Sequence, residues 1–200
     1  SDSLKTVRKS VLIYETIILQ VDDGISFVFH TIEPIRDDDE YGGYRVSFSA
    51  SFGKIHAPMS MDISTGDIIT PDATIHVFAD MLDKNMTFEL WSYPIETVLA
   101  EKVETILSRG VDNTRTRDFY DIYMLMGYEY DRNEFLKAYK ATAMHRDSFD
   151  KIKDFDGILD SIRASSEMNQ RWLKYTRQMP YARGIDFSDV LEKVKNLLEE

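Results

Sequence analysis

The 200-residue sequence contains no cysteine. Disulfide frameworks, zinc sites with cysteine ligands, iron–sulfur clusters and thiol catalysis are therefore excluded. The sequence also has no apolar run close to the roughly 18 residues that a membrane-spanning helix needs, and no signal peptide is visible. We therefore predict a cytoplasmic protein without a membrane partner.

Several signatures of enzymes are missing as well. The sequence has no phosphate-binding loop, no dinucleotide-binding glycine fingerprint and no nucleophile elbow. Its four histidines lie at positions 30, 56, 76 and 145, without the spacing of metal ligands. We interpret all four as structural.

Positive charge is scarce. The chain has 24 Lys and Arg residues against 35 Asp and Glu residues, a formal net charge of −11. This balance argues against a general nucleic-acid coat protein, although a local basic surface remains compatible with it. One such segment lies between residues 163 and 183, where Glu167 is the only acid among five basic residues: Arg163, Arg171, Lys174, Arg177 and Arg183.

The apolar content is sufficient for a buried core, because 43% of the residues are hydrophobic and 12% are aromatic. Helical spacing of apolar residues predicts a helix over residues 4–19. Alternating patterns and turn residues then predict a sheet. Its strands are expected at residues 25–32, 44–52, 54–64, 75–81 and 87–91, with a solvated loop at 36–43.

The pattern changes at Pro94, after which periodicity is helical. We expect one helix from Glu96 to Arg109 and a second through Tyr128, capped by Asp112-Asn113-Thr114. Further helices are expected at residues 133–144, 148–165, 167–179 and 188–198. Strands followed by helices predict an α+β fold, with a sheet-containing domain at 1–93 and a helical domain at 94–200.

Lys102 lies at the edge of the apolar stripe of the first of these helices, four residues after Val98 and four before Ile106. A lysine in this position either extends along the helix to the solvent or points into a polar pocket. In a pocket its ammonium group is a compact donor for phosphate oxygens. Both interpretations remain open from the spacing alone.

Asp118 and Asp121 share one face of the next helix because they are three residues apart. Asp118 also lies in the first turn, where the helix dipole favours a carboxylate, so a structural role is sufficient to explain it. The functional alternative is that Asp118 orients Lys102, binds a metal or acts as a base. Arg115 and Arg117 either contact phosphates or pair with these acids.

Asp62 follows Met61 on a predicted strand and is expected to point to the face opposite Met59, Met61 and Ile63. We regard it as a candidate metal carboxylate, with Arg45 on the neighbouring strand. Magnesium usually takes oxygen ligands from more than one residue, so one acid is a weak indication.

Aromatic residues alternate with basic ones in the segment that contains Arg171, Trp172, Lys174, Tyr175 and Arg177. Phosphate contacts beside a stacking ring are typical of single-stranded RNA recognition. The alternative is an amphipathic helix with Trp172 in the core and solvated cations outside.

Two segments resemble the AbiEii/AbiGii family, the nucleotidyltransferase-like toxins of abortive-infection systems. They are Tyr93-Pro-Ile-Glu-Thr-Val-Leu-Ala-Glu-Lys102 with the following Ser108-Arg-Gly, and Asn113-Thr-Arg-Thr-Arg-Asp-Phe-Tyr-Asp-Ile122. The strands from Arg45 to Asp67 are also similar, and the likeness covers roughly residues 1–128. The family more often has Lys at the position of Arg117.

The resemblance implies a sheet similar to part of the polymerase-β-type nucleotidyltransferase fold, followed by helices. It implies transfer of a nucleotide from a nucleoside triphosphate to an RNA acceptor, which is transfer RNA in studied relatives, with magnesium bridging carboxylates and phosphates. By position, Lys102 matches the family's lysine, Asp118 its later essential acid and Asp62 its third sheet carboxylate. Arg45, Arg115 and Arg117 are then expected at the nucleotide, and a cognate antitoxin is an expected partner.

One family motif is missing from residues 1–60, namely Gly-Ser followed by an Asp-x-Asp pair, which supplies two metal-binding carboxylates. Either the chain is the C-terminal portion of a longer toxin or this member has lost the motif. We therefore expect this polypeptide alone to be inactive. The alternative function is a non-catalytic module that binds RNA or a protein.

Overall fold

The computed structural model describes residues 24–35, 43–64, 66 and 68–199. The chain divides into two compact units, Ser1–Asp67 and Ile68–Glu200. The predicted helix at 4–19 and most of the predicted loop at 36–43 lie outside the described residues. Among the described residues, no helix is long and apolar enough to span a membrane.

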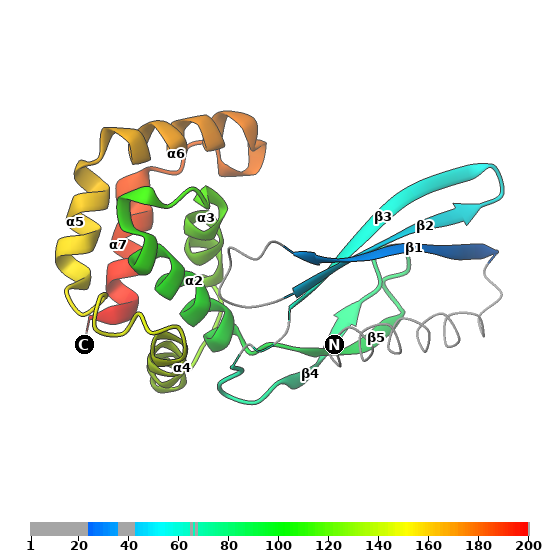
Figure 1. Ribbon diagram of the computed structural model, residues 1–200, viewed down its shortest axis with the longest axis horizontal. Helices are drawn as coiled ribbons and strands as arrows, with labels where there is room; N and C mark the ends of the chain where they lie inside the picture. The colour runs from blue at the N-terminus through cyan, green and yellow to red at the C-terminus, as the bar shows by residue number, and fades with distance from the viewer. Residues whose placement is uncertain (1–23, 36–42, 65, 67, 200) are drawn as a thin grey trace. The chain divides into compact units, whose positions relative to one another are not determined.

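The first unit contains an antiparallel sheet of three strands in the order β1-β2-β3 (Figure 1). The strands are β1 (Ile25–Ile35), β2 (Gly43–Phe52) and β3 (Ile55–Ser64). Gly53 and Lys54 alone join β2 to β3, and Gly53 adopts a positive φ of 57° in this tight turn. All three strands confirm the prediction from alternating residues.

The register of the sheet gives it one apolar face and one polar face. Val46 lies opposite Met61 and Phe48 opposite Met59, whereas Arg45 lies opposite Asp62. Because side chains alternate along a strand, Arg45 and Asp62 point away from the methionines. The predicted orientation of Asp62 is therefore confirmed.

The second unit begins with an antiparallel hairpin of β4 (Thr74–Ala79) and β5 (Thr87–Ser92). Strand β4 ends two residues earlier than predicted. The Asp80 carboxylate accepts the backbone N–H groups of Leu82 and Asp83 at 2.7 and 2.8 Å, which turns the chain before Met81.

Six α-helices follow the hairpin within the described residues, as predicted. They are α2 (Ile95–Arg109), α3 (Thr116–Leu125), α4 (Arg132–His145), α5 (Phe155–Ala164), α6 (Ser166–Gln178) and α7 (Phe187–Leu198). Two short 3₁₀ helices, η1 (Gly110–Asp112) and η2 (Pro180–Ala182), precede α3 and α7. The α+β class and its order of strands then helices are confirmed.

Two predicted helix starts are wrong. Helix α3 begins at Thr116 without a side-chain cap, because the Asn113 carboxamide oxygen instead accepts the backbone N–H of Arg115 at 2.8 Å in a local turn. Helix α5 begins at Phe155 rather than Ser148, and Asp154 caps it by accepting the N–H of Gly157.

The helices enclose one continuous core. Leu99, Val103 and Ile106 of α2 are fully buried and pack in the same cluster as Phe119 of α3 and Phe135 of α4. Strands give way to helices at Pro94, as expected, while the division into compact units falls earlier, between Asp67 and Ile68. The domain boundary at residue 93 stays a prediction.

Candidate functional site

Helix α2 places Lys102 beside the most buried part of the second unit. The next residue, Val103, is fully buried, as is Leu99 one turn earlier. Lys102 itself keeps only 20% of its side chain exposed. The lysine therefore has most of its aliphatic chain covered, and its ammonium group requires polar partners.

Those partners come from the first two turns of α3. The Lys102 Nζ donates to Asp118 Oδ1 at 2.8 Å and to Asp121 Oδ2 at 2.7 Å. The Asp118 side chain is only 9% exposed, and Asp121 is partly covered as well. The sequence left open whether Lys102 extends to solvent or points into a polar environment, and the structure shows the second arrangement.

Asp121 also binds Lys102, although the sequence analysis gave it no functional role. Its spacing of three residues from Asp118 placed both carboxylates on one helix face, which was the available signal. The missing information was that Lys102 lies within hydrogen-bond distance of both.

Two arginines form the outer part of the same cluster. Arg115 Nε lies 3.0 Å from Asp118 Oδ2, and Arg117 Nε lies 3.7 Å from Asp121 Oδ1. The Arg117 side chain is 78% exposed. We call these five side chains the Lys102 cluster: Lys102, Arg115, Arg117, Asp118 and Asp121. With three cations and two carboxylates, the cluster carries one net positive charge and presents its guanidinium groups to solvent.

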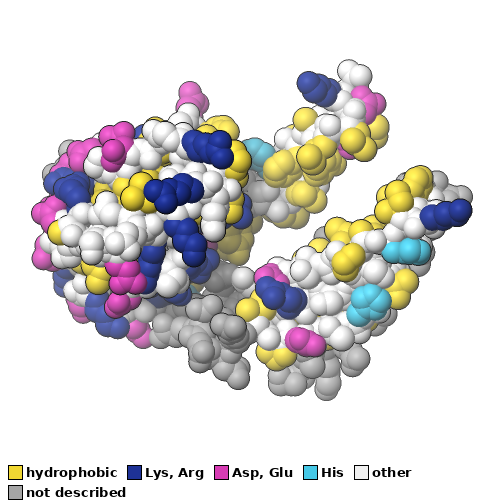
Figure 2. Space-filling model, turned by 90° about the horizontal axis from the view of Figure 1, so that it is seen from above, with side chains coloured by type: hydrophobic (Ala, Val, Ile, Leu, Met, Phe, Trp, Pro, Cys, Tyr) yellow, Lys and Arg dark blue, Asp and Glu magenta, His cyan; other side chains and the backbone are white. Residues whose placement is uncertain are grey.

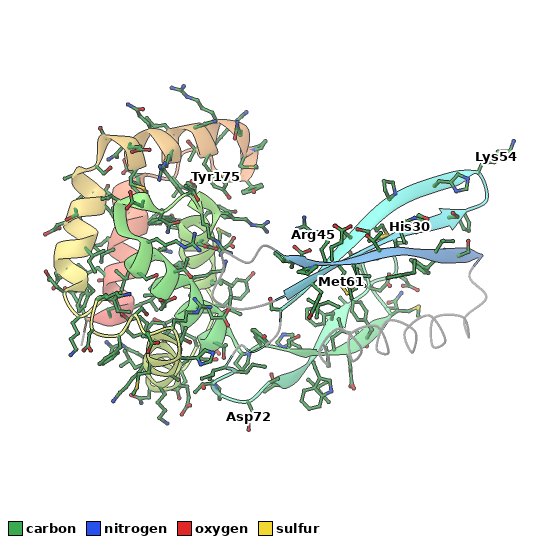
Figure 3. All side chains as sticks on the ribbon, viewed as in Figure 1. His30, Arg45, Lys54, Met61, Asp72 and Tyr175 are labelled. Atoms are coloured by element: carbon green, nitrogen blue, oxygen red, sulfur yellow. The ribbon has the colours of Figure 1, made fainter. Side chains whose placement is uncertain are left out.

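Arg45 and Asp62 form a separate pair in the first unit. Arg45, labelled in Figure 3, donates from Nε and Nη2 to the two Asp62 carboxylate oxygens at 2.7 and 2.8 Å, which makes a bidentate ion pair across β2 and β3. The hydrogen bonds from Arg45 lower the pKa of the Asp62 carboxyl below its ordinary value. Both side chains are about half exposed.

This pair bears on the expected magnesium site. Both Asp62 oxygens already accept hydrogen bonds from Arg45, and among the described residues no three His, Asp or Glu side chains lie together as a metal site. Magnesium takes several oxygen ligands. The described residues therefore do not fit a magnesium ion by themselves.

Arg171 of α6 binds the backbone of the segment before α3. Its Nη1 donates to the carbonyl oxygens of Asn113 at 2.7 Å and Val111 at 3.4 Å, while its Nη2 donates to Glu167 at 2.6 Å. Arg171 thus holds the segment that leads into α3. This contact stabilises the start of the helix that carries Asp118.

Trp172, the next residue, belongs to the core. It is 2% exposed, donates from its indole Nε1 to the Ile185 carbonyl at 3.0 Å and stacks on Phe187 with ring centroids 5.4 Å apart. Its ring is therefore not available to a base. Lys174 and Arg177 are exposed on the other side of α6, which agrees with the amphipathic interpretation of this segment.

Lys and Arg side chains lie among Asp and Glu side chains on the face of the helical unit seen in Figure 2, which views the molecule from the side where α6 lies in Figure 1. The exposed cations in this part of the chain include Arg117 of α3, Lys174 and Arg177 of α6, and Arg183 after η2. Of the five cations in residues 163–183, Lys174, Arg177 and Arg183 are thus exposed, whereas Arg163 pairs with Asp160 and Arg171 with Glu167. A single basic surface formed by this segment stays a prediction.

The amino-acid sequence matches a protein-family model. The family model described as nucleotidyl transferase AbiEii toxin, type IV TA system, matches residues 12–193. No curated protein and no solved structure matches the chain. The matched range includes both the Arg45–Asp62 pair and the whole Lys102 cluster.

Proposed function

The chain belongs to the AbiEii nucleotidyl transferase toxin family of type IV toxin–antitoxin systems, and on this premise we propose that its Lys102 cluster binds the triphosphate of a nucleoside triphosphate. The nucleotide would be transferred to an RNA acceptor, with transfer RNA as the expected class. The observation that carries the proposal is the convergence of Lys102 with Asp118 and Asp121 beneath two exposed arginines.

The two carboxylates act as positioning residues in this proposal. An ammonium group has three donors, and Lys102 gives one to each carboxylate. The direction of its remaining donor is then fixed, which lowers the entropy cost of binding a phosphate oxygen there. Arg115 and Arg117 supply planar guanidinium groups that suit phosphate oxygens.

The reaction is a displacement at the α-phosphorus. A bond forms between an RNA hydroxyl oxygen and the α-phosphorus, the α–β phosphoanhydride bond breaks, pyrophosphate leaves and the hydroxyl proton is released. Negative charge grows on the pyrophosphate oxygens, and fixed cations lower the barrier by stabilising that charge. In this scheme Lys102 touches the phosphates, and Asp118 acts through Lys102.

Magnesium and the nucleotide chemistry that it supplies are expected only together with the carboxylates of the family's Gly-Ser…Asp-x-Asp motif. We infer that Asp62 would join such a site only after exchanging its Arg45 partner. The 200-residue chain by itself is then inactive. Incubation with labelled nucleoside triphosphates, magnesium and transfer RNA should give no incorporation, and robust incorporation would refute this inference.

Nucleotide binding tests the main proposal directly. Titration calorimetry with GTP and magnesium should show binding to the chain, and Lys102→Ala should weaken it at least tenfold. Lys137→Ala is the matched control, because Lys137 is also ion-paired, with Glu134 at 2.7 Å, but lies on the exposed side of α4. Equal binding by Lys102→Ala and the unmodified chain would overturn the proposal.

A second candidate function is a non-catalytic module that docks RNA or a protein such as a cognate antitoxin. One observation favours it: Lys174 and Arg177 of α6 and Arg183 after η2 are exposed to solvent. Arg171, Lys174 and Arg177 are the expected RNA contacts in either case. RNA binding that is unchanged by Lys102→Ala, without nucleotide binding, would identify this module.

A further inference from the structure

Three tyrosines from three different elements come together beside the Lys102 cluster. The rings of Tyr120 on α3 and Tyr181 on η2 have centroids 4.9 Å apart. The ring centroid of Tyr175 on α6, labelled in Figure 3, lies 6.2 Å from that of Tyr120, and the Tyr175 hydroxyl is 3.4 Å from that of Tyr181. We call Tyr120, Tyr175 and Tyr181 the tyrosine platform.

The three rings of the tyrosine platform differ in their exposure to solvent. Tyr175 is 9% exposed, Tyr120 is half-buried and Tyr181 is 54% exposed. Behind Tyr175 lies Trp172, at a ring distance of 5.7 Å, which is anchored in the core. Tyr181 therefore presents an aromatic surface to solvent while the rings beneath it are held in place.

Two members of the Lys102 cluster, Asp121 and Arg117, are close enough to the tyrosine platform to act on it electrostatically. Tyr120 directly precedes Asp121 on α3. The pKa of the Tyr175 hydroxyl is raised well above its ordinary value, first by burial, then by Tyr181 and by the negative charge of Asp121, while Arg117 opposes the rise. The electrostatic environment of this phenol therefore includes the same carboxylate that accepts a hydrogen bond from Lys102.

Exposed cations lie on the same two helices as these rings. Arg117 is exposed one turn before Tyr120 on α3, and its charge acts on the Tyr175 hydroxyl. Lys174 and Arg177 are exposed on the outer side of α6, whereas Tyr175 faces the core. The only acid between residues 163 and 183, Glu167, is paired with Arg171 at 2.6 Å. Exposed rings among cations are the combination that single-stranded nucleic acid requires, because bases stack on rings and phosphates pair with cations.

We propose that the tyrosine platform stacks an unpaired base at the single-stranded end of the RNA acceptor, with Tyr181 as the first ring that the base meets. Arg117, Lys174 and Arg177 bind the neighbouring phosphates. The inference rests on the proposed function and deepens it, because it names the part of the acceptor that is recognised. It also explains how an RNA end would be brought beside the triphosphate at Lys102.

Fluorescence anisotropy with two labelled RNA hairpins tests the proposal. One hairpin ends in a single-stranded 3′ tail of four nucleotides and the other is blunt. Tyr181→Ala should weaken binding of the tailed hairpin by about tenfold, as expected for one lost stacked base, and leave the blunt hairpin unchanged. Tyr181→Phe should bind like the unmodified chain because it retains the ring.

Tyr128→Ala is the matched control, since Tyr128 is 66% exposed beyond the end of α3. It should leave both affinities unchanged. Equal loss for the two hairpins, no loss for the tailed one, or tighter binding of an acidic peptide than of the tailed hairpin would overturn the inference. If Tyr181→Ala instead weakens GTP binding and spares RNA, the base belongs to the nucleotide and the inference also fails.

The two proposals fail in different ways. Absence of RNA binding by the unmodified chain would refute the RNA acceptor and the platform together. Tailed RNA bound normally by Tyr181→Ala, with GTP binding lost in Lys102→Ala, would refute the platform and leave the proposed function intact.

Discussion

Lys102 on α2 and Asp118 on α3 form an ion pair with an N–O distance of 2.8 Å, and Asp118 is almost covered. Two charges at this distance gain more from each other where water is largely excluded than they do at a surface. Removal of either partner leaves the other partly covered with one ion pair fewer, since Lys102 keeps Asp121 and Asp118 keeps Arg115. The pair therefore ties two helices of the core together in addition to any role in binding.

A double-mutant cycle should measure this coupling. Lys102→Met and Asp118→Asn are each expected to lower the free energy of unfolding by about 1–3 kcal/mol. The double variant should lose less than the sum, by about 1 kcal/mol, because the interaction is lost only once. Urea unfolding of the four proteins gives the values. Additive losses would show that the two side chains do not interact in solution.

Most of the fold could be predicted because its elements have local causes. Alternation of large apolar and small polar residues identified β2, and the stripe through Leu99, Val103 and Ile106 identified α2. The start of α3 could not be predicted in this way. Asn113 is a residue type that caps helices, and only the structure shows that its side chain closes a separate turn before Thr116.

Part of the candidate site could be predicted from the sequence for the same reason. Helical spacing placed Lys102 at an edge and paired Asp118 with Asp121, but the contact between α2 and α3 depends on tertiary packing. The role of Arg171 could not be predicted from the sequence. Charge alone does not distinguish an arginine that contacts phosphate from one that binds the carbonyl of Asn113, 58 residues earlier in the chain.

The Asp62 carboxyl should titrate at a lower pH than an ordinary aspartate. Its pKa in the folded chain is lowered by the hydrogen bonds from Arg45. The pair therefore stabilises the strands above the unfolded pKa of about 3.9, and this contribution disappears as the pH falls through the lower folded value. Carboxyl carbon NMR across a pH titration measures the shift. Arg45→Ala should return the Asp62 pKa toward the ordinary value, and an unchanged titration in that variant would contradict the assignment.

Arg171→Ala should destabilise the segment before α3. The substitution leaves the carbonyls of Val111 and Asn113 without their guanidinium donor, which is expected to cost about 1–2 kcal/mol. Hydrogen exchange should accelerate at the backbone amides of residues 113–118. Lys174→Ala, three residues along the same helix and exposed, should change neither quantity. Identical behaviour of the two variants would show that Arg171 does not hold the segment.

Trp172→Ala should be among the most damaging single substitutions in α6. It removes a ring that stacks on Phe187 and the hydrogen bond to the Ile185 carbonyl, with an expected loss of about 3–5 kcal/mol in the free energy of unfolding. The adjacent Leu173 is 52% exposed, and Leu173→Ala should change the value by less than about 0.5 kcal/mol. Denaturant unfolding of both variants would distinguish them. A larger loss for Leu173→Ala would mean that α6 presents its other face to the core.

If the exposed cations of α6 contact phosphates, RNA binding should depend on salt concentration through them. Each phosphate contact releases counterions, so the logarithm of the association constant falls with the logarithm of salt concentration by about 0.7 per contact for a single strand. Lys174→Ala and Arg177→Ala should each reduce that slope by about this amount and weaken all single-stranded sequences alike. Lys153→Ala, an exposed lysine before α5, is the control and should leave the slope unchanged. A lower affinity with an unchanged slope would mean that Lys174 and Arg177 support the fold of the surface rather than contact phosphates. Arg171 already donates to the backbone and to Glu167. Arg171→Ala should therefore reduce the salt slope less than Lys174→Ala or Arg177→Ala does.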